Sequence, residues 1–106
     1  MPAAALSSDA LRETHLISRR GDWRAWSTVI RGAGRTSTVV LLHDAVLETA
    51  ETVRGHLGLA PSTFLPIKVV AILKDAKRRS VADRWPTIDY RQAIELVADA
   101  DRVVSW

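Results

Sequence analysis

The sequence predicts an α/β protein, built as one three-layer α/β/α domain with a mostly parallel sheet of about five strands. Two short runs carry this prediction: TSTVVLL at 36–42 and IKVVAIL at 67–73. Both are rich in aliphatic and β-branched residues, as is typical of central parallel strands covered on both faces. Segments with helical spacing alternate with these runs and with shorter strand candidates, and this alternation indicates a parallel sheet between helix layers.

The N-terminus is expected to lie outside the folded domain. Residues 1–14 are rich in Ala and Ser, and we interpret them as an extension with a frayed helix over residues 10–14. The domain then occupies residues 15–106 and begins with a short strand at 15–19.

Two helices are expected between the first three strands. Asp22 is placed to cap the first, and Gly32 and Gly34 to end it, because glycine accepts the left-handed conformation at helix C-termini. One face of this helix carries Trp23, Trp26 and Ile30. Asp44 is placed to cap the second helix, before a loop at 60–66. The apolar stripe of the second helix consists of Val46, Ala50, Val53 and Leu57.

The C-terminal third completes the alternation. A charged helical turn is expected over 74–79 and a brief strand at 87–88. Asp89, with Gln92 three residues later, resembles a capping box at the start of the last helix, and the final strand spans 102–106. The face of this helix that we expect to be buried carries Tyr90, Ala93, Ile94 and Val97.

Composition narrows the class of protein. The 106 residues suffice for one domain, and the 47% apolar and 25% charged fractions are ordinary for a globular protein. No apolar stretch reaches the roughly 18 residues that a membrane span requires. The N-terminus lacks the basic start and apolar block of a secretory signal. Because the chain has no cysteine, it forms no disulfide, and we expect a cytoplasmic protein.

The charge distribution argues against nucleic-acid binding. The formal net charge is only +3, whereas nucleic-acid binders usually carry a concentrated basic face. One dense cluster exists, formed by Lys74, Lys77, Arg78, Arg79 and Arg84. We interpret it as a solvated helix face beside a turn, with a nucleic-acid patch as the alternative.

Candidate site residues follow from the rule that open α/β sheets bind ligands at the carboxyl ends of their strands. Five residues are predicted to gather there: Arg20, His43, Asp44, Lys74 and Asp75. His43 and Asp44 offer an acid/base pair, since imidazole titrates near neutral pH. We favour the structural interpretation, with Asp44 as a helix cap and His43 as a polar residue at a strand end.

Other classes of site find little support in the sequence. The three histidines lack metal-ligand spacing, no Gly-x-Ser-x-Gly motif occurs, and Gly32 and Gly34 follow a helix, the wrong place to cradle a phosphate. We therefore expect no metal and no cofactor, and an enzyme that uses His43 and Asp44 is the least favoured of the functions considered. Trp85 and Trp106 do not fall at obvious core positions. Tryptophan outside the core is typical of a protein interface, and we predict one at these two residues. The alternative is that both cover the edge of the core.

Three segments of the chain resemble the DsrE/DsrF/DsrH superfamily, most closely its DsrH/TusB branch. They read VVLLHDAV (39–46), PIKVVAILKDAKRRSV (66–81) and TIDYRQAIELVADADRVVSW (87–106). The shared features are an apolar strand that ends in an acidic residue, a strand followed by a charged turn, an Ile-Asp-Tyr step into a helix, and a last strand ending near a tryptophan. Val70 departs from the family pattern, which usually has tyrosine there.

The resemblance implies a subunit of a sulfur-relay complex that serves tRNA wobble-uridine 2-thiolation or sulfur oxidation. Its partners would be cysteine-bearing DsrE/DsrF (TusC/TusD)-like subunits. Some DsrH-type proteins carry a cysteine near the positions of Thr28 and Val29. Because a thiolate is the nucleophile in such transfers, this cysteine-free chain is expected to be a structural or docking subunit. The alternative is a homo-oligomeric α/β protein that binds a small anion or a protein partner without sulfur chemistry.

Overall fold

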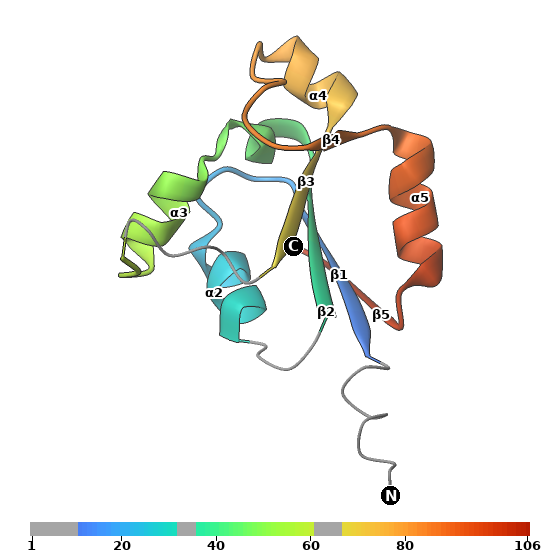
Figure 1. Cartoon of the computed structure of the whole chain (residues 1–106), viewed down its shortest axis with the longest axis horizontal. Helices are drawn as coiled ribbons and strands as arrows, with labels where there is room; N and C mark the ends of the chain where they lie inside the picture. Colours follow the sequence, from blue (N-terminus) through green and yellow to red (C-terminus); the bar gives the residue numbers. More distant parts are fainter. Residues whose placement is uncertain (1–10, 32–35, 61–66) are drawn as a thin grey trace, which may run out of the picture.

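A parallel sheet runs through the centre of the protein (Figure 1). The computed structural model describes residues 11–31, 36–60 and 67–106, and within them all five strands are parallel, in the order β4-β3-β2-β1-β5. The predicted α/β fold is thus confirmed. The strands are β1 (Arg12–Ile17), β2 (Thr36–Leu41), β3 (Lys68–Ile72), β4 (Thr87–Ile88) and β5 (Arg102–Ser105).

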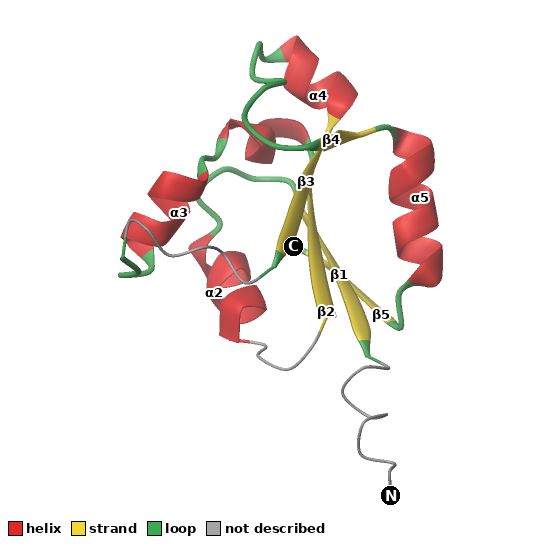
Figure 2. Cartoon of the chain, in the orientation of Figure 1, coloured by secondary structure: helices red, strands yellow, loops and turns green. Residues whose placement is uncertain are grey.

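Helices cover the two faces of the sheet unequally. Helices α2 (Trp23–Arg31) and α3 (Ala50–His56) lie on one face, and α5 (Tyr90–Asp99) lies on the other (Figure 2). The short α4 (Leu73–Arg78) directly follows β3. The steps from β1 to β4 all move in one direction across the sheet, so right-handed crossovers place their connections on one face. The step from β4 back to β5 moves in the opposite direction, which carries α5 to the other face.

The larger core fills the space between the sheet and helices α2 and α3. Trp26 is its largest fully buried side chain, at 1% exposure, and its ring lies 6.4 Å from that of Trp85. Apolar side chains of all the neighbouring elements surround it: Ile17, Val29, Val39, Leu41, Val46, Val53 and Val69. Removal of these apolar side chains from water is the main force that holds α2 and α3 on the sheet.

A smaller core lies beneath α5. Its buried members are Val40, Val70, Ile72 and Ala93. The predicted burial of the α5 face is wrong in two places, since Tyr90 is 45% and Ile94 68% exposed. The helix rests on the sheet through Ala93 and Leu96, and Tyr90 and Ile94 lie to one side of that contact line, where no further described element covers them.

The segment after β2 differs from the prediction of one helix capped by Asp44. A 3-10 helix (η1, His43–Leu47) comes first, and α3 follows as a separate helix. Asp44 caps neither: the N-cap of α3 is Thr49, whose Oγ1 accepts a hydrogen bond from the Thr52 backbone N–H. Glu48 interrupts the helix because its backbone is extended (φ −66°, ψ 156°) and its side chain turns into the protein interior.

Other helix ends follow the predictions. Asp22 caps α2 through Oδ1, which accepts from the Ala25 N–H at 3.2 Å. The capping box of α5 is present, with Asp89 Oδ1 and Gln92 Oε1 accepting from each other's backbone N–H groups at 2.8 and 2.9 Å. The predicted stop at Gly32 and Gly34, and the predicted loop from residue 61 onward, lie outside the described residues.

The first strand begins earlier than expected. β1 starts at Arg12, so the frayed helix expected over residues 10–14 is wrong for residues 12–14, while Ala10 lies outside the described residues. Strand pairing explains the difference, because β1 hydrogen-bonds to β2 on one side and β5 on the other. The Arg12 N–H also donates to Asp101 Oδ2 at 2.8 Å, at the start of β5.

Candidate functional site

The carboxyl ends of β1, β2 and β3 bring several of the predicted site residues to one edge of the sheet. Asp75 is 3% exposed, and its Oδ2 accepts a hydrogen bond from the His43 backbone N–H at 2.8 Å. This bond joins the loop after β2 to the start of α4. It also holds His43 at φ 49°, in the left-handed region that non-glycine residues seldom occupy. The role of Asp75 in the described structure is therefore to fix a loop.

Asp44 is tied to α4 rather than to its neighbour. Its Oδ1 accepts from Arg79 at 2.9 Å (Nη2) and 3.0 Å (Nε), and Arg79 Nη1 donates to the Asp75 carbonyl. The His43 ring is exposed, with no bond to Asp44 among the described residues. The two residues thus lack the geometry of an acid/base pair.

Glu48 is a buried carboxylate that sequence reasoning missed. It is 1% exposed, and its Oε2 accepts from the Gly21 N–H at 2.7 Å, which fixes the loop after β1. Gly21 has φ 75°, a conformation that glycine adopts at little cost. The Glu48 backbone carbonyl accepts from Trp85 Nε1 at 2.8 Å. Trp85, predicted as an interface residue, is half-buried and packs against the larger core.

A second buried network surrounds Trp106. Trp106 Nε1 donates to His15 Nδ1 at 3.1 Å, and His15 Nε2 lies 3.4 Å from Glu13 Oε1. Because indole only donates, His15 Nδ1 must be the acceptor, which places the imidazole proton on Nε2, facing Glu13. Glu13 and His15 are 5% and 3% exposed. With both ring nitrogens engaged, His15 has no position left for a metal or a substrate.

Replacing Trp106 with phenylalanine should remove this donor and leave His15 Nδ1 unsatisfied. We expect the free energy of unfolding to fall by about 1–2 kcal/mol, measured by urea denaturation. Trp23→Phe is the matched control, since no described residue hydrogen-bonds the Trp23 indole, although its ring stacks on His56 at 4.0 Å. Equal losses in the two variants would contradict the assignment. Nitrogen chemical shifts should report the Nε2–H tautomer of His15 in the unaltered protein only.

Three of the predicted site residues remain unengaged at the carboxyl edge. Arg20, the His43 ring and Lys74 are exposed and have no hydrogen bond or ion pair with any described residue. They follow β1, β2 and β3, which are neighbours in the sheet. The edge presents the cations Arg20 and Lys74 and the His43 imidazole, together with the Asp44 carboxylate, which is 68% exposed and paired with Arg79. Such a surface suits an anionic group or an acidic partner surface.

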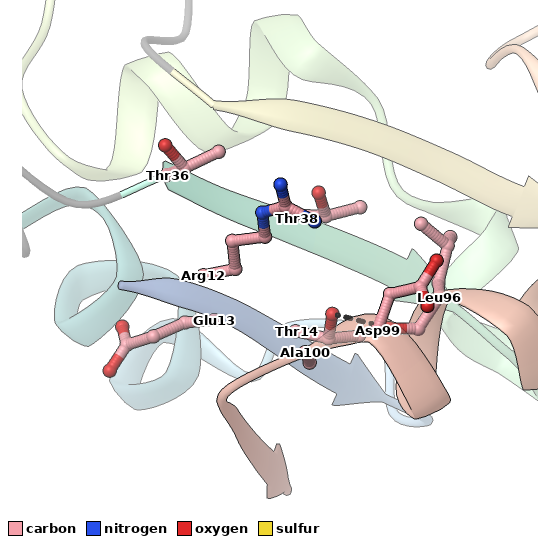
Figure 3. A pocket seen from close by; sticks show the side chains of 8 residues that line it. All are labelled: Arg12, Glu13, Thr14, Thr36, Thr38, Leu96, Asp99 and Ala100. Carbon is pink, nitrogen blue, oxygen red and sulfur yellow. Dashed lines mark hydrogen bonds between the residues drawn. The ribbon is translucent and has the colours of Figure 1, made fainter. Parts of the chain in front are cut away.

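A separate small pocket lies at the opposite, amino end of β1 and β2. It has a volume of about 130 Å³ and is lined mainly by Arg12, Thr14, Thr36, Thr38 and Asp99. Figure 3 shows the Thr14 hydroxyl directed at α5, where it donates to the Leu96 carbonyl at 3.5 Å, while Glu13 points to the other face of the strand. Since ligands of parallel sheets bind at the carboxyl ends, we do not place the functional site here.

The described residues show neither a metal-binding cluster nor a membrane span. No group of three or more His, Cys, Asp or Glu side chains in the described ranges could hold a metal ion. Among the helices described, none has both the length and the apolar character needed to cross a bilayer.

The fold and the edge together define a cysteine-free α/β protein with a five-stranded, all-parallel sheet. Comparison with protein-family models finds no match, and comparison with curated proteins also finds none. The class of protein therefore rests on the fold, and the resemblance to the DsrE/DsrF/DsrH superfamily rests on the three sequence segments alone.

Proposed function

We propose that the chain is a non-catalytic docking subunit of a cytoplasmic sulfur-relay complex of the DsrEFH/TusBCD kind. The resemblance of three ordered segments supports the complex, which would act in tRNA 2-thiolation or sulfur oxidation. The docking role rests on the carboxyl edge of the sheet, where Arg20, His43 and Lys74 are exposed and make no side-chain bond to any described residue. The nearby carboxylates are bonded within the protein, Asp75 to the His43 backbone and Asp44 to Arg79.

The chemistry of sulfur transfer fits this edge. A thiolate or persulfide is anionic, and cationic side chains nearby favour the charged form. With no cysteine of its own, the chain would leave the reacting sulfur on its partners. Its contribution would be to attract and orient a cysteine-bearing DsrE/DsrF-like subunit, since charge complementarity mainly raises the association rate and fixes the orientation.

Binding to DsrE/DsrF-like subunits from the same organism tests this proposal. The double variant Arg20→Glu/Lys74→Glu should weaken binding about tenfold or more, mainly through slower association. Lys68→Glu is the matched control, because Lys68 is also exposed but lies at the amino end of β3. If the unaltered chain binds no such subunit, or if both variants bind equally well, the proposed function is wrong.

A second candidate is an α/β binding protein without sulfur chemistry that holds a small anion at the same edge. The unengaged Arg20 and Lys74 favour it. Phosphate, sulfate and nucleotides should then raise the melting temperature of the unaltered protein but not of Arg20→Glu/Lys74→Glu. Absence of any such shift would eliminate this candidate.

A further inference from the structure

The exposed large apolar side chains of the described residues gather on one side of the molecule. They are Tyr90, Ile94 and Val103, with exposed fractions of 45%, 68% and 39%. Tyr90 and Ile94 belong to α5. Val103 pairs in register with Thr14, whose hydroxyl bonds to the Leu96 carbonyl of α5, so that Val103 also faces the α5 side of the sheet.

Tyr90 and Ile94 border a groove between α5 and the carboxyl halves of β1 and β2. The groove has a volume of about 230 Å³, and all seven lining residues are apolar or aromatic: Leu16, Val40, Leu42, Tyr90, Ala93, Ile94 and Val97. We call the groove together with Val103 the α5 surface. Its exposure follows from the topology, because α5 is the single described helix on this face while α2 and α3 share the other. A contiguous apolar surface of this kind marks an interaction site.

The charges at the two ends of α5 have opposite signs. At the Tyr90 end, Lys74 and Lys77 line an adjoining hollow together with Asp89, so that two cations stand there against one carboxylate. At the C-terminal end, the exposed Asp99 lies on the last turn and the exposed Asp101 lies just beyond it. Two copies of this surface related by a two-fold axis would run their α5 helices antiparallel. That arrangement brings the basic end of each copy to the acidic end of the other, and it also pairs the helix dipoles favourably.

We propose that the α5 surface is the interface between two copies of this chain, in a symmetric dimer whose axis passes near Ile94. The surface is self-complementary in the way that an isologous interface requires: apolar at its centre and oppositely charged at its ends. Self-association through this face is separable from the functions proposed above, because Arg20 lies in the loop after β1 and His43 at the start of η1, both away from α5. Lys74 borders both surfaces.

Sedimentation equilibrium of the unaltered chain and of Ile94→Asp tests the interface. We expect a dimer for the unaltered chain and a dissociation constant raised about 30-fold or more in the variant, the size typical of an interface hot spot. Ile94 is already exposed, so Ile94→Asp should keep its fold, and a circular dichroism spectrum checks this. Ala82→Asp, at an exposed position in the loop after α4, is the matched control and should remain dimeric. The proposal is overturned if the unaltered chain is still a monomer at roughly 0.1 mM, which is 100 times a micromolar dissociation constant. It is also overturned if Ile94→Asp forms a dimer of unchanged affinity.

Charge reversal tests the antiparallel arrangement. Lys77→Glu and Asp99→Lys should each weaken the dimer, and the double variant should recover most of the lost affinity, because each end then meets its opposite again. Additive losses in the double variant would overturn the two-fold geometry. Binding of Ile94→Asp to cysteine-bearing relay subunits should match that of the unaltered chain, which separates failure of this proposal from failure of the sulfur-relay function.

Discussion

Replacing Trp26 with alanine should lower the free energy of unfolding by about 3–5 kcal/mol, the largest loss expected for any single side chain described. Trp26 is 1% exposed and lies between α2 and the sheet, beside Trp85. The substitution removes the buried indole and leaves a cavity that its packed neighbours can fill only in part. Urea denaturation followed by circular dichroism measures the loss.

Trp23→Ala provides the control for this experiment. Trp23 is on the same helix but only half-buried, and its ring stacks on the exposed His56. We expect it to lose less than half as much stability as Trp26→Ala. If the two losses were equal, the burial of Trp26 would not be what holds α2 against the sheet.

Replacing Glu48 with alanine should cost about 3 kcal/mol, from a lost hydrogen bond and a small cavity together. The buried Glu48 carboxylate accepts the Gly21 N–H at 2.7 Å, and alanine leaves that donor without its partner. Glu48→Gln keeps the volume and one acceptor oxygen, so it should lose less. Urea denaturation ranks the variants, and amide exchange at Gly21 should become faster in Glu48→Ala.

An exposed glutamate nearby supplies the reference for Glu48. Glu51 lies in the first turn of α3, and Glu51→Ala should change stability by less than about 0.5 kcal/mol, as is usual for surface substitutions. A loss for Glu48→Ala no larger than that of Glu51→Ala would show that the loop after β1 does not need the carboxylate.

The strand pattern and the helix caps could be predicted because both are local in sequence. The runs at 36–42 and 67–73 each contain a strand, and Asp22 and Asp89 cap the helices that follow them. These features need only a few neighbouring residues, since β-branched runs and side-chain bonds three residues along are readable from spacing.

Features that depend on distant partners could not be predicted in the same way. Glu48 looks like a solvent-facing helix residue in the sequence, and its partner Gly21 is 27 positions away. The partner of His15 in the Trp106 network is 91 positions away. The exposure of Ile94 was equally hidden, because helical spacing identifies an apolar face without revealing how much of that face the sheet covers.

The location of the candidate site at the strand ends could be predicted, but the bonds that its side chains make could not. Arg20, His43 and Lys74 do follow adjacent parallel strands. The sequence did not reveal that Asp75 would be buried beneath the His43 backbone, nor that Asp44 would pair with Arg79. These two bonds give Asp44 and Asp75 structural roles and leave no acid/base pair between His43 and Asp44.

The position of β1 between β2 and β5 has a consequence for how the chain folds. Residues 12–17 pair with β2 on one side, but on the other side they pair with Arg102–Ser105, which are synthesised much later. During translation this edge of β1 therefore stays unpaired until β5 has left the ribosome. Closing so long a loop is slow, and an unpaired strand edge invites pairing with other chains. The sheet should therefore be completed only after β5 has been made, and nascent chains that stop before β5 should be the species most prone to aggregate.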